Sequence, residues 1–565
     1  MTVFALKYNV HGLAQSRVDA PAPPPHIRLA CQNDVLLFGD VYHQDVSDRL
    51  RLRALLGQIT PEDLRRTLLT KCWGNFVCVF PASAERPYLE VLRSPFSTLD
   101  CFTALNDNHL YIFSDLTLAQ GLGLPIRAID WTFVRQTLVY ANLAGGRTGL
   151  TGISQILPGF SGVWQAGSLV QKPIWSPWPF TDRNRQFRTL PEATFALRQS
   201  LDHTMSRLTD GLTHAFIELS GGLDSSIIAG CLAGRGFPMT ALNLITPVPG
   251  ADERVYARDV SVLSNIDTSY QELDLEAVEA IVEPETLHPL PGMEMLQAAV
   301  DRMSVTHFKP TRTDTLFTGA GGDSVLCYLS TAGSAADALL TFGPGSRFWT
   351  ALHDLCSLYN ITLWKGARLV LKKVFAKPHL GWKAERRFLS DEATAVQPFD
   401  HPWLTRPPGV PPGKAQHALE SLSSKFFIEG MGRRYTAQVH LPLLCQPVVE
   451  TCLRIPTWMW TDQGQNRAIA RYAFADRLPD RVRLRRSKGN FVGYYGQVYE
   501  RARDQLRPYL CEGELATAGL IDVAALNTYL NQPIAKRDRE FQRVFELARM
   551  ESWLRSTKRR LGTPT

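Results

Sequence analysis

Two short segments of this chain bring glycines, hydroxyl groups and a carboxylate together in an order that suits phosphate chemistry. The first follows the apolar stretch Phe216–Leu219 and reads Ser220-Gly221-Gly222-Leu223-Asp224-Ser225-Ser226. Its two glycines let the backbone turn tightly and approach a ligand closely. A helix that opens at Leu223 directs its first amides, and the positive end of its dipole, at a bound anion. Asp224 could then hold a magnesium ion on the phosphates, although an ordinary strand-to-helix turn is the alternative reading.

The second segment repeats this arrangement later in the chain. An apolar run, Thr315–Thr318, leads into Gly319-Ala320-Gly321-Gly322-Asp323. The carboxyl ends of neighbouring parallel strands meet at one edge of a sheet, where α/β folds bind nucleotides. We therefore expect Asp224 and Asp323 to share one magnesium ion. The other residues expected at the nucleotide are Ser220, Gly221, Gly222, Ser225, Thr318 and Gly319.

These motifs resemble those of the asparagine synthetase-like superfamily, and the resemblance extends over nearly the whole chain. Asp252–Ala257 (DERVYA) and Gly464–Arg471 (GQNRAIAR) resemble further signatures, and Arg486–Gly489 (RSKG) resembles the family's catalytic lysine loop. The resemblance implies an ATP pyrophosphatase loop of the PP-loop type, with ATP and Mg²⁺ as cofactors. It also implies that Lys488 contacts the phosphates and stabilises charge as pyrophosphate leaves. A solvated basic face over Arg481–Lys488 is the alternative.

The composition excludes several classes of protein. With 565 residues and 45% hydrophobic content, the chain is long enough for two or more globular domains. A formal net charge of +7 suits a nucleotide and gives little support to nucleic-acid binding, which needs a clustered basic stripe. We expect no membrane span, because no apolar run is long enough, and no signal peptide. The ten cysteines form no C-x-x-C pair, which indicates reduced thiols in a cytoplasmic protein.

The first half of the chain reads as short β-strands separated by turns, which predicts an α+β sandwich of two sheets. Gly39–Tyr42, Trp73–Phe76 and Arg93–Phe96 resemble signatures of the glutaminase (Ntn-like) domain of the same superfamily. A working glutaminase of this type needs a cysteine as its first mature residue, because the thiolate attacks the amide and the free amine is the base. This chain has Thr2 there, and its first cysteine is Cys31. We therefore expect a degenerate domain that serves as a scaffold or docking surface, with residual activity of Thr2 as the alternative.

The domain boundaries follow from a change of pattern near residue 180. We expect a degenerate glutaminase-like domain over 1–180, a linker over 181–190 and an asparagine synthetase-like ligase domain over 191–565. In the last of these, strands and helices alternate, which predicts an α/β doubly wound parallel sheet. Leu369–Phe375 is predicted as an amphipathic helix with a solvated basic face, and the proline-rich segment Asp400–Gly413 as a lid or binding loop.

Members of the superfamily differ in the amine that attacks the adenylated carboxylate. Where relatives carry a glutamate or tyrosine for amine activation, this chain has Ala320, which cannot move a proton. Leu441–Glu450 (LPLLCQPVVE) carries Cys445 in place of the aspartate of asparagine synthetases. Together with the absent N-terminal cysteine, these features resemble the lasso peptide cyclases, relatives of the β-lactam synthetases.

This resemblance implies a macrolactam synthetase. Such an enzyme adenylates an Asp or Glu side chain of a leader-free precursor peptide and joins it to the peptide's own N-terminal amine as an isopeptide bond. It implies a leader peptidase and a leader-binding protein as partners. The alternatives are another amide ligase that acts on a small amino acid and a non-catalytic, nucleotide-binding scaffold. Glu450 is a candidate for orienting the substrate or taking a proton, against the alternative of a surface carboxylate.

Overall fold

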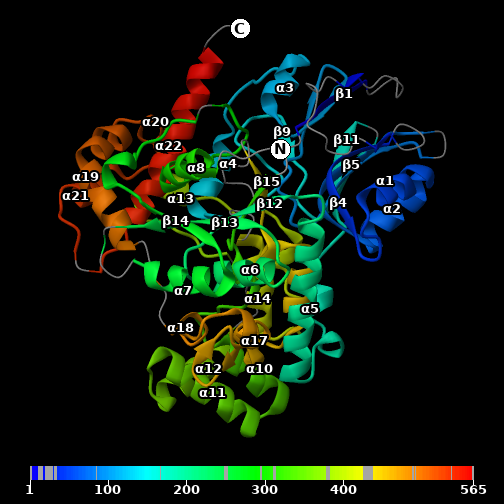
Figure 1. Ribbon diagram of the computed structural model, residues 1–565. Coiled ribbons are helices and arrows are strands. Elements are labelled where there is room, and N and C mark those ends of the chain that lie inside the picture. Colours follow the sequence, from blue (N-terminus) through cyan, green and yellow to red (C-terminus); the bar gives the residue numbers. More distant parts are fainter. Residues whose placement is uncertain are drawn as a thin grey trace.

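The structure is a computed structural model with three visible parts (Figure 1). These are a strand-rich N-terminal part, a central parallel sheet with its helices, and a group of helices at the lower end of the molecule. The described residues are 3–9, 17–18, 29–30, 35–83, 86–165, 167–246, 248, 252–284, 286–292, 295–308, 314–376, 382–423, 437–486, 489, 492–535 and 537–562.

The N-terminal part is built from two antiparallel sheets. One has the order β2-β1-β8-β7-β9 and the other the order β11-β10-β6-β5-β4-β3. Apolar side chains from both sheets, among them Phe4, Phe38, Val77 and Ile112, form one buried cluster between them, as in other face-to-face sheet packings. The strands are β1 (Ala5–Asn9), β2 (Arg17–Val18), β3 (Leu29–Ala30), β4 (Leu36–His43), β5 (Cys72–Phe80), β6 (Leu89–Arg93), β7 (Phe102–Asn106), β8 (His109–Phe113), β9 (Ile153–Gln155), β10 (Phe160–Gln165) and β11 (Ser168–Pro173).

Helices cover the outer faces of both sheets. Leu52 and Leu56 of α1 (Arg49–Gln58) and Leu64 and Leu68 of α2 (Pro61–Thr70) pack on the second sheet. The first sheet is covered by α3 (Leu116–Gly121), α4 (Trp131–Val139) and the C-terminal helix α22 (Phe541–Gly562). The predicted α+β sandwich is therefore present, with helices as additional outer layers.

The central sheet is parallel throughout and has the order β14-β13-β12-β15-β16. The chain adds strands outward from β12 on one side and then returns to add β15 and β16 on the other. The order therefore reverses between β12 and β15, and such a switch point opens a crevice at the carboxyl ends of the two strands. This confirms the predicted parallel sheet. The strands are β12 (His214–Glu218), β13 (Met239–Ile245), β14 (Asp267–Glu272), β15 (Asp314–Phe317) and β16 (Gln438–His440).

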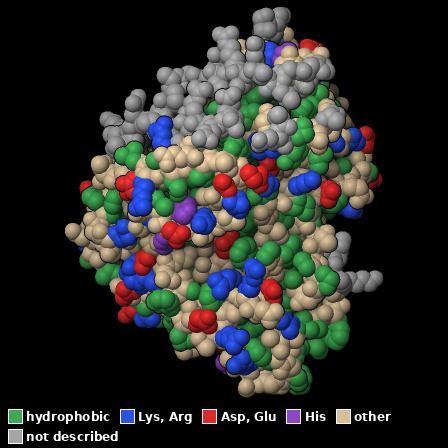
Figure 2. All heavy atoms as spheres, turned by 90° about the vertical axis from the view of Figure 1, so that its right-hand side faces the viewer, with side chains coloured by type: hydrophobic (Ala, Val, Ile, Leu, Met, Phe, Trp, Pro, Cys, Tyr) green, Lys and Arg blue, Asp and Glu red, His purple; other side chains and the backbone are tan. Residues whose placement is uncertain are grey.

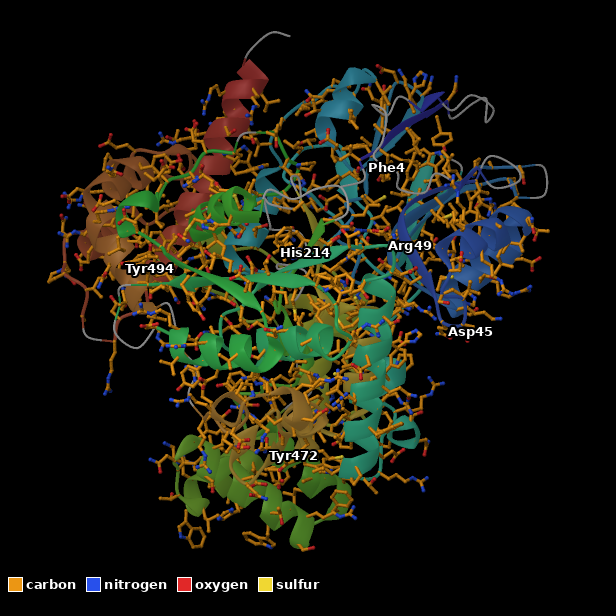
Figure 3. All side chains as sticks on the ribbon, in the orientation of Figure 1. Phe4, Asp45, Arg49, His214, Tyr472 and Tyr494 are labelled. Carbon is orange, nitrogen blue, oxygen red and sulfur yellow. The ribbon has the colours of Figure 1, made fainter. Side chains whose placement is uncertain are left out.

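Local capping signals position the helices around this sheet. α5 (Leu190–Leu208) begins after Thr189, whose hydroxyl accepts a hydrogen bond from the amide of Glu192, as the capping-box spacing predicts. Near the site lie α6 (Leu223–Ala233), α7 (Arg254–Ser264), α9 (Gly322–Val325), α14 (Pro412–Ser423), α16 (Gln446–Arg454) and α17 (Ala468–Ala473). Figure 3 labels His214 at the start of β12, and Tyr472 of α17 between the sheet and the lower helices.

The proline-rich segment Asp400–Gly413 differs from its prediction as a lid. His401 and Trp403 are buried, and the Trp403 ring contacts Trp175 edge-on, with centroids 5.1 Å apart. Its prolines therefore stiffen a packed connection between the N-terminal part and α14. Within the described residues, no helix is long and apolar enough to cross a bilayer, and all nine described cysteines are free thiols.

Candidate active site

The loop after β12 forms a compact turn whose hydroxyl groups are tied together. Gly221 has a φ of +77°, which glycine adopts without strain. The Ser220 and Ser225 hydroxyl oxygens lie 3.1 Å apart, and the Gly222 amide donates to Ser220 Oγ. No side chain caps the start of α6 at Gly222, so the first amides of the helix are left for another acceptor. This arrangement suits a bound phosphate group.

The loop after β15 lies directly against the first loop. A Cβ added to Gly319 would come within 2.7 Å of the Ser225 amide nitrogen, and one on Gly322 within 2.5 Å of Asp224 Cγ. Larger residues at either position would therefore separate the two loops. Thr318 is buried, and its amide donates to the carbonyl of His440 on the neighbouring strand. The close backbone approach that the glycines predict is present at both positions.

Arg467 joins the two carboxylates that the sequence assigns to magnesium. Its Nη1 lies 3.0 Å from Asp224 Oδ1 and 2.7 Å from Asp323 Oδ1. Arg467 is buried, has a left-handed φ of +53°, and stacks its guanidinium over the Tyr328 ring. Asp224 and Asp323 therefore converge on one point that a cation occupies, although they stand far apart in the sequence.

This pair of carboxylates fits a magnesium site of the nucleotide-dependent kind. Mg²⁺ is usually bound by one or two carboxylates together with substrate phosphates and waters, rather than by a cage of protein ligands. In the described part of the chain, no group of three or more His, Cys, Asp or Glu side chains could hold a metal ion. Asp224 and Asp323 would thus supply the protein's oxygens, and the ion would supply charge neutralisation on the phosphates.

Two contacts place the basic segment around Arg485 beside the loop that follows β12. A Cβ on Gly221 would meet the α7 backbone, at 2.7 Å from the Ala257 nitrogen, so the start of α7 packs on this loop. Just before α7, Glu253 accepts from Arg485 Nη1 at 2.6 Å and from the Gly489 amide at 3.1 Å. The Arg485 guanidinium also lies over the Tyr256 ring, 3.8 Å from its centroid.

The basic segment that begins at Arg481 is therefore not a solvated face throughout, because the Arg485 side chain is only 11% exposed. Lys488 itself lies outside the described residues. Its neighbour Gly489 is held at Glu253, beside the loop that follows β12.

Glu420 is a titratable residue of the site that the sequence reasoning did not identify. It lies on α14, which is joined to α9 by a hydrogen bond from His417 Nε2 to the Val325 carbonyl, at 2.9 Å. Burial raises the pKa of the Glu420 carboxyl to about 8, with a further contribution from the negative charge of Asp323. No motif marks this residue, and only the packing of α14 on α9 brings it to the site.

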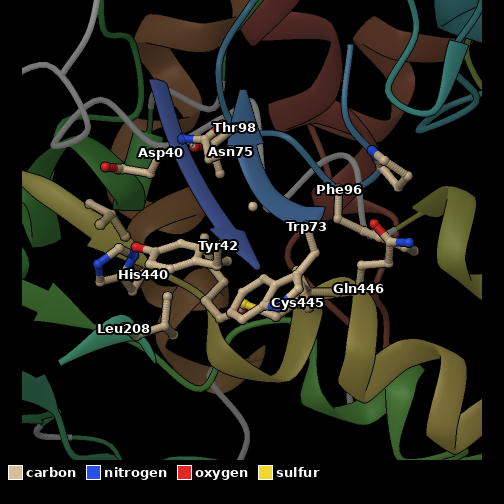
Figure 4. Close-up of a pocket in the computed structure, with 15 residues that line it drawn as sticks. Asp40, Tyr42, Trp73, Asn75, Phe96, Thr98, Leu208, His440, Cys445 and Gln446 are labelled. Atoms are coloured by element: carbon tan, nitrogen blue, oxygen red, sulfur yellow. Dashed lines mark hydrogen bonds between the residues drawn. The ribbon is translucent and has the colours of Figure 1, made fainter. Parts of the chain in front are cut away.

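A pocket lies between the N-terminal part and the segment that follows β16 (Figure 4). Its cavity volume is about 50 Å³. Tyr42 of β4 and Trp73 of β5 stack on one side, with ring centroids 4.7 Å apart. His440 and Cys445 also line the pocket, and burial lowers the pKa of His440 to about 4.

Two features connect this pocket to the site and to a ligand. Leu444, another lining residue, is the side chain that a Cβ on Gly321 would touch, at 2.6 Å. The pocket therefore adjoins the loop that carries Asp323. The indole nitrogen of Trp73 and Nε2 of His440 are buried and have no hydrogen-bond partner among the described residues.

Glu450 is held in the interior by two side chains. It lies on α16 and accepts hydrogen bonds from Trp175 Nε1 and Gln446 Nε2, both at 2.8 Å. Burial raises the pKa of its carboxyl. Glu450 thus joins the segment near residue 175 to α16, which argues against the alternative of a surface carboxylate. Thr2 and Cys31 lie outside the described residues.

Comparisons with known proteins give one family match. The model of the asparagine synthase family matches residues 196–363 and 426–555. No curated protein matches the chain. Similar solved structures include the allosteric regulatory enzyme of purine biosynthesis and the glutamine phosphoribosylpyrophosphate amidotransferase from B. subtilis. Each is 9% identical with a TM-score of 0.17, and the matches cover 44% and 54% of this chain. The chain spans 62% of the first structure's length and 67% of the second's.

Proposed function

Because the chain belongs to the asparagine synthase family, we propose that it is an AMP-forming amide ligase that closes a peptide into a macrolactam, as the lasso peptide cyclases do. The convergence of two glycine loops and two carboxylates at the switch point between β12 and β15 carries this proposal. Anion-binding amides and paired carboxylates are what Mg·ATP needs.

The reaction has two steps. A carboxylate oxygen of an Asp or Glu side chain attacks the α-phosphorus of ATP, the bond to the bridging oxygen breaks, and pyrophosphate leaves. The peptide's N-terminal amine then attacks the acyl carbon, AMP leaves, and the amine proton passes to a base. In the first step, Ser220, Ser225 and the amides at the start of α6 hold the departing pyrophosphate. Lys488 would stabilise its charge, and Asp224 and Asp323 would hold a magnesium ion that neutralises charge on the phosphates.

The proton acceptor in the second step is the least conventional part of the site. Ala320 stands at the position where relatives carry an acid–base residue, and it cannot accept a proton. Glu420 supplies a carboxylate on the adjoining helix, and its pKa of about 8 is close to that of a peptide α-amine. We assign Glu420 as the base, because it is a carboxyl group on the helix that packs against α9, which carries Asp323. It can accept a proton only when ionised, so ring closure should speed up as the pH rises toward the pKa of Glu420.

In this proposal, the pocket beside Gly321 takes one side chain of the peptide. It adjoins the loop of Asp323, and the stacked rings of Tyr42 and Trp73 line it. These rings offer an apolar surface to that side chain. In this proposal the N-terminal part is a wall of the peptide site. The partners are a leader peptidase that releases the peptide and a leader-binding protein.

The test incubates the protein with a leader-free candidate precursor peptide, ATP and Mg²⁺, followed by mass spectrometry and assay of AMP and pyrophosphate. The expected product has lost one water, with one AMP formed per ring. Asp323→Asn and Lys488→Ala should abolish both products. The control is Asp480→Asn, a conservative change of a side chain that is 77% exposed, which should retain activity.

Two other outcomes would change the assignment. If AMP formed with a small amino acid while the peptide stayed unchanged, the chain would be a ligase for small substrates. If isothermal titration showed no binding of Mg·ATP to the wild-type protein, the ligase proposal itself would fail.

A further inference from the structure

The helices at the lower end of the molecule carry an exposed apolar surface that the ligase reaction does not use. They are α10 (Gly333–Phe342), α11 (Ser346–Tyr359) and α12 (Leu363–Val374), and Figure 1 places them at the far end from the N-terminal strands. Among the described residues, nine of the twenty exposed large hydrophobic side chains lie in this segment. They are Leu340, Phe342, Trp349, Tyr359, Leu363, Trp364, Leu369, Leu371 and Phe375.

The most exposed of these side chains form a stripe along α12. Trp364 is 88% exposed and Phe375 79%, and Leu371 lies between them. Their spacing of seven and four residues places all three on one face of the helix. The opposite face is fixed, because Val370 is fully buried and a Cβ on Gly366 would touch Cys356 Sγ of α11 at 2.5 Å. The stripe therefore points outward from a helix that is packed in place.

The charges around this stripe have one sign. Lys365, Arg368 and Lys372 of α12 are exposed, and their positions around the helix lie next to the stripe. The only acidic residues between 333 and 376, Asp337 and Asp354, are buried. Every exposed Asp, Glu, Lys or Arg side chain in this segment is therefore a Lys or an Arg. In Figure 2, hydrophobic and basic side chains lie beside one another at this lower end.

We propose that α12 seats the protein on an anionic lipid bilayer. Trp364, Leu371 and Phe375 enter the interface, and Lys365, Arg368 and Lys372 reach the lipid phosphates. Aromatic and aliphatic side chains beside a basic face are the features of helices that lie in the membrane interface. Lys and Arg can bury their stems while their charges stay with the headgroups. Because α12 lies at an end of the molecule, a flat surface can reach it without contact with the active site.

The experiment measures binding to vesicles by co-sedimentation, with the full chain. One set contains phosphatidylglycerol mixed with phosphatidylcholine, and the other contains phosphatidylcholine alone. We expect binding to the anionic set to be at least tenfold stronger and to weaken at 0.5 M salt, because each basic residue near such a surface contributes about 1 kcal/mol. Lys365→Glu/Lys372→Glu and Trp364→Ser/Phe375→Ser should each lower binding about tenfold or more.

Two controls separate this surface from general stickiness. Phe195→Ser removes a 67% exposed aromatic side chain from α5 and should leave vesicle binding unchanged. Brominated lipids should quench tryptophan fluorescence in the wild type, and Trp364→Phe should reduce this quenching while binding persists. All variants should keep the thermal midpoint and the ATP-dependent activity of the wild type.

Three results would overturn the proposal. They are equal binding to both vesicle sets, an equal loss in Phe195→Ser, and no binding at all. In the last case, a change of oligomeric state in Trp364→Ser/Phe375→Ser, measured by light scattering, would assign the stripe to a second copy of the chain.

Discussion

Arg467 is the residue that joins the two halves of the site. Two partly buried carboxylates this close repel each other unless a cation lies between them, and Arg467 Nη1 contacts both Asp224 and Asp323. Arg467→Met keeps a long side chain at the same left-handed backbone position. We expect it to lower the free energy of unfolding by about 1–3 kcal/mol in magnesium-free buffer.

Added Mg²⁺ should then restore more stability to this variant than it adds to the wild type, because the ion replaces the missing cation. Thermal unfolding with EDTA and with MgCl₂ measures both effects. Arg483→Met is the control, because Arg483 pairs with an exposed Asp480 on its own helical turn. Identical magnesium responses in Arg467→Met and wild type would contradict this role.

Glu420 gives the site a pH-dependent stability. Burial raises the pKa of its carboxyl to about 8 in the folded chain, against about 4.3 in an unfolded one. The folded state therefore binds the extra proton between these values, and stability is lost as the pH rises through this window. Glu420→Gln removes that loss. Its stability advantage over the wild type should be near zero at pH 4.5 and should grow as the pH rises to 8.5, by at most about 1.4 kcal/mol per pH unit.

Urea unfolding at several pH values, without nucleotide or metal, measures this advantage. Glu512→Gln, on the exposed surface, is the control and should show no pH-dependent difference. An advantage that is the same at pH 4.5 and pH 8.5 would show that the effect of Glu420→Gln does not come from ionisation.

Among the structural elements, the strands and loops that short sequence motifs specify can be predicted from the sequence. The apolar runs before Ser220 and Gly319 predict two parallel strands, and the glycines predict the close approach of their loops. Glu420 cannot be predicted in this way, because no motif marks it. Arg467 stands within the signature segment Gly464–Arg471, but the sequence does not indicate that its side chain contacts the two carboxylates.

For helix surfaces and long loops, too, a local sequence pattern does not show which other elements pack against them. The amphipathic α12 is predicted with a solvated basic face, but a local pattern does not reveal that its apolar stripe lacks a covering element. The proline content of Asp400–Gly413 predicts a lid or binding loop, but it does not indicate that Trp403 packs on Trp175.

At the scale of the whole molecule, the two predicted domains share their buried clusters. Tyr42, Trp73 and Trp175 belong to the same cluster as Ile217 and Phe317 of the central sheet. Trp553 of α22 packs on the first N-terminal sheet, where a Cβ on Gly149 would come within 2.3 Å of its ring. Neither part can therefore bury its apolar surface alone.

We expect the full chain to unfold in one cooperative transition, because separating the parts exposes several buried aromatic side chains at about 1.5–3 kcal/mol each. Residues 191–565 expressed alone should aggregate, whereas co-expression with residues 1–180 should restore a soluble complex with the midpoint of the intact chain. A protease site placed between 181 and 190 provides the matched test, since cleavage there should leave the two pieces eluting together. Differential scanning calorimetry and size-exclusion chromatography measure these outcomes. Two separate transitions, or a stable and monomeric 191–565 fragment, would show that the shared clusters do not couple the two parts.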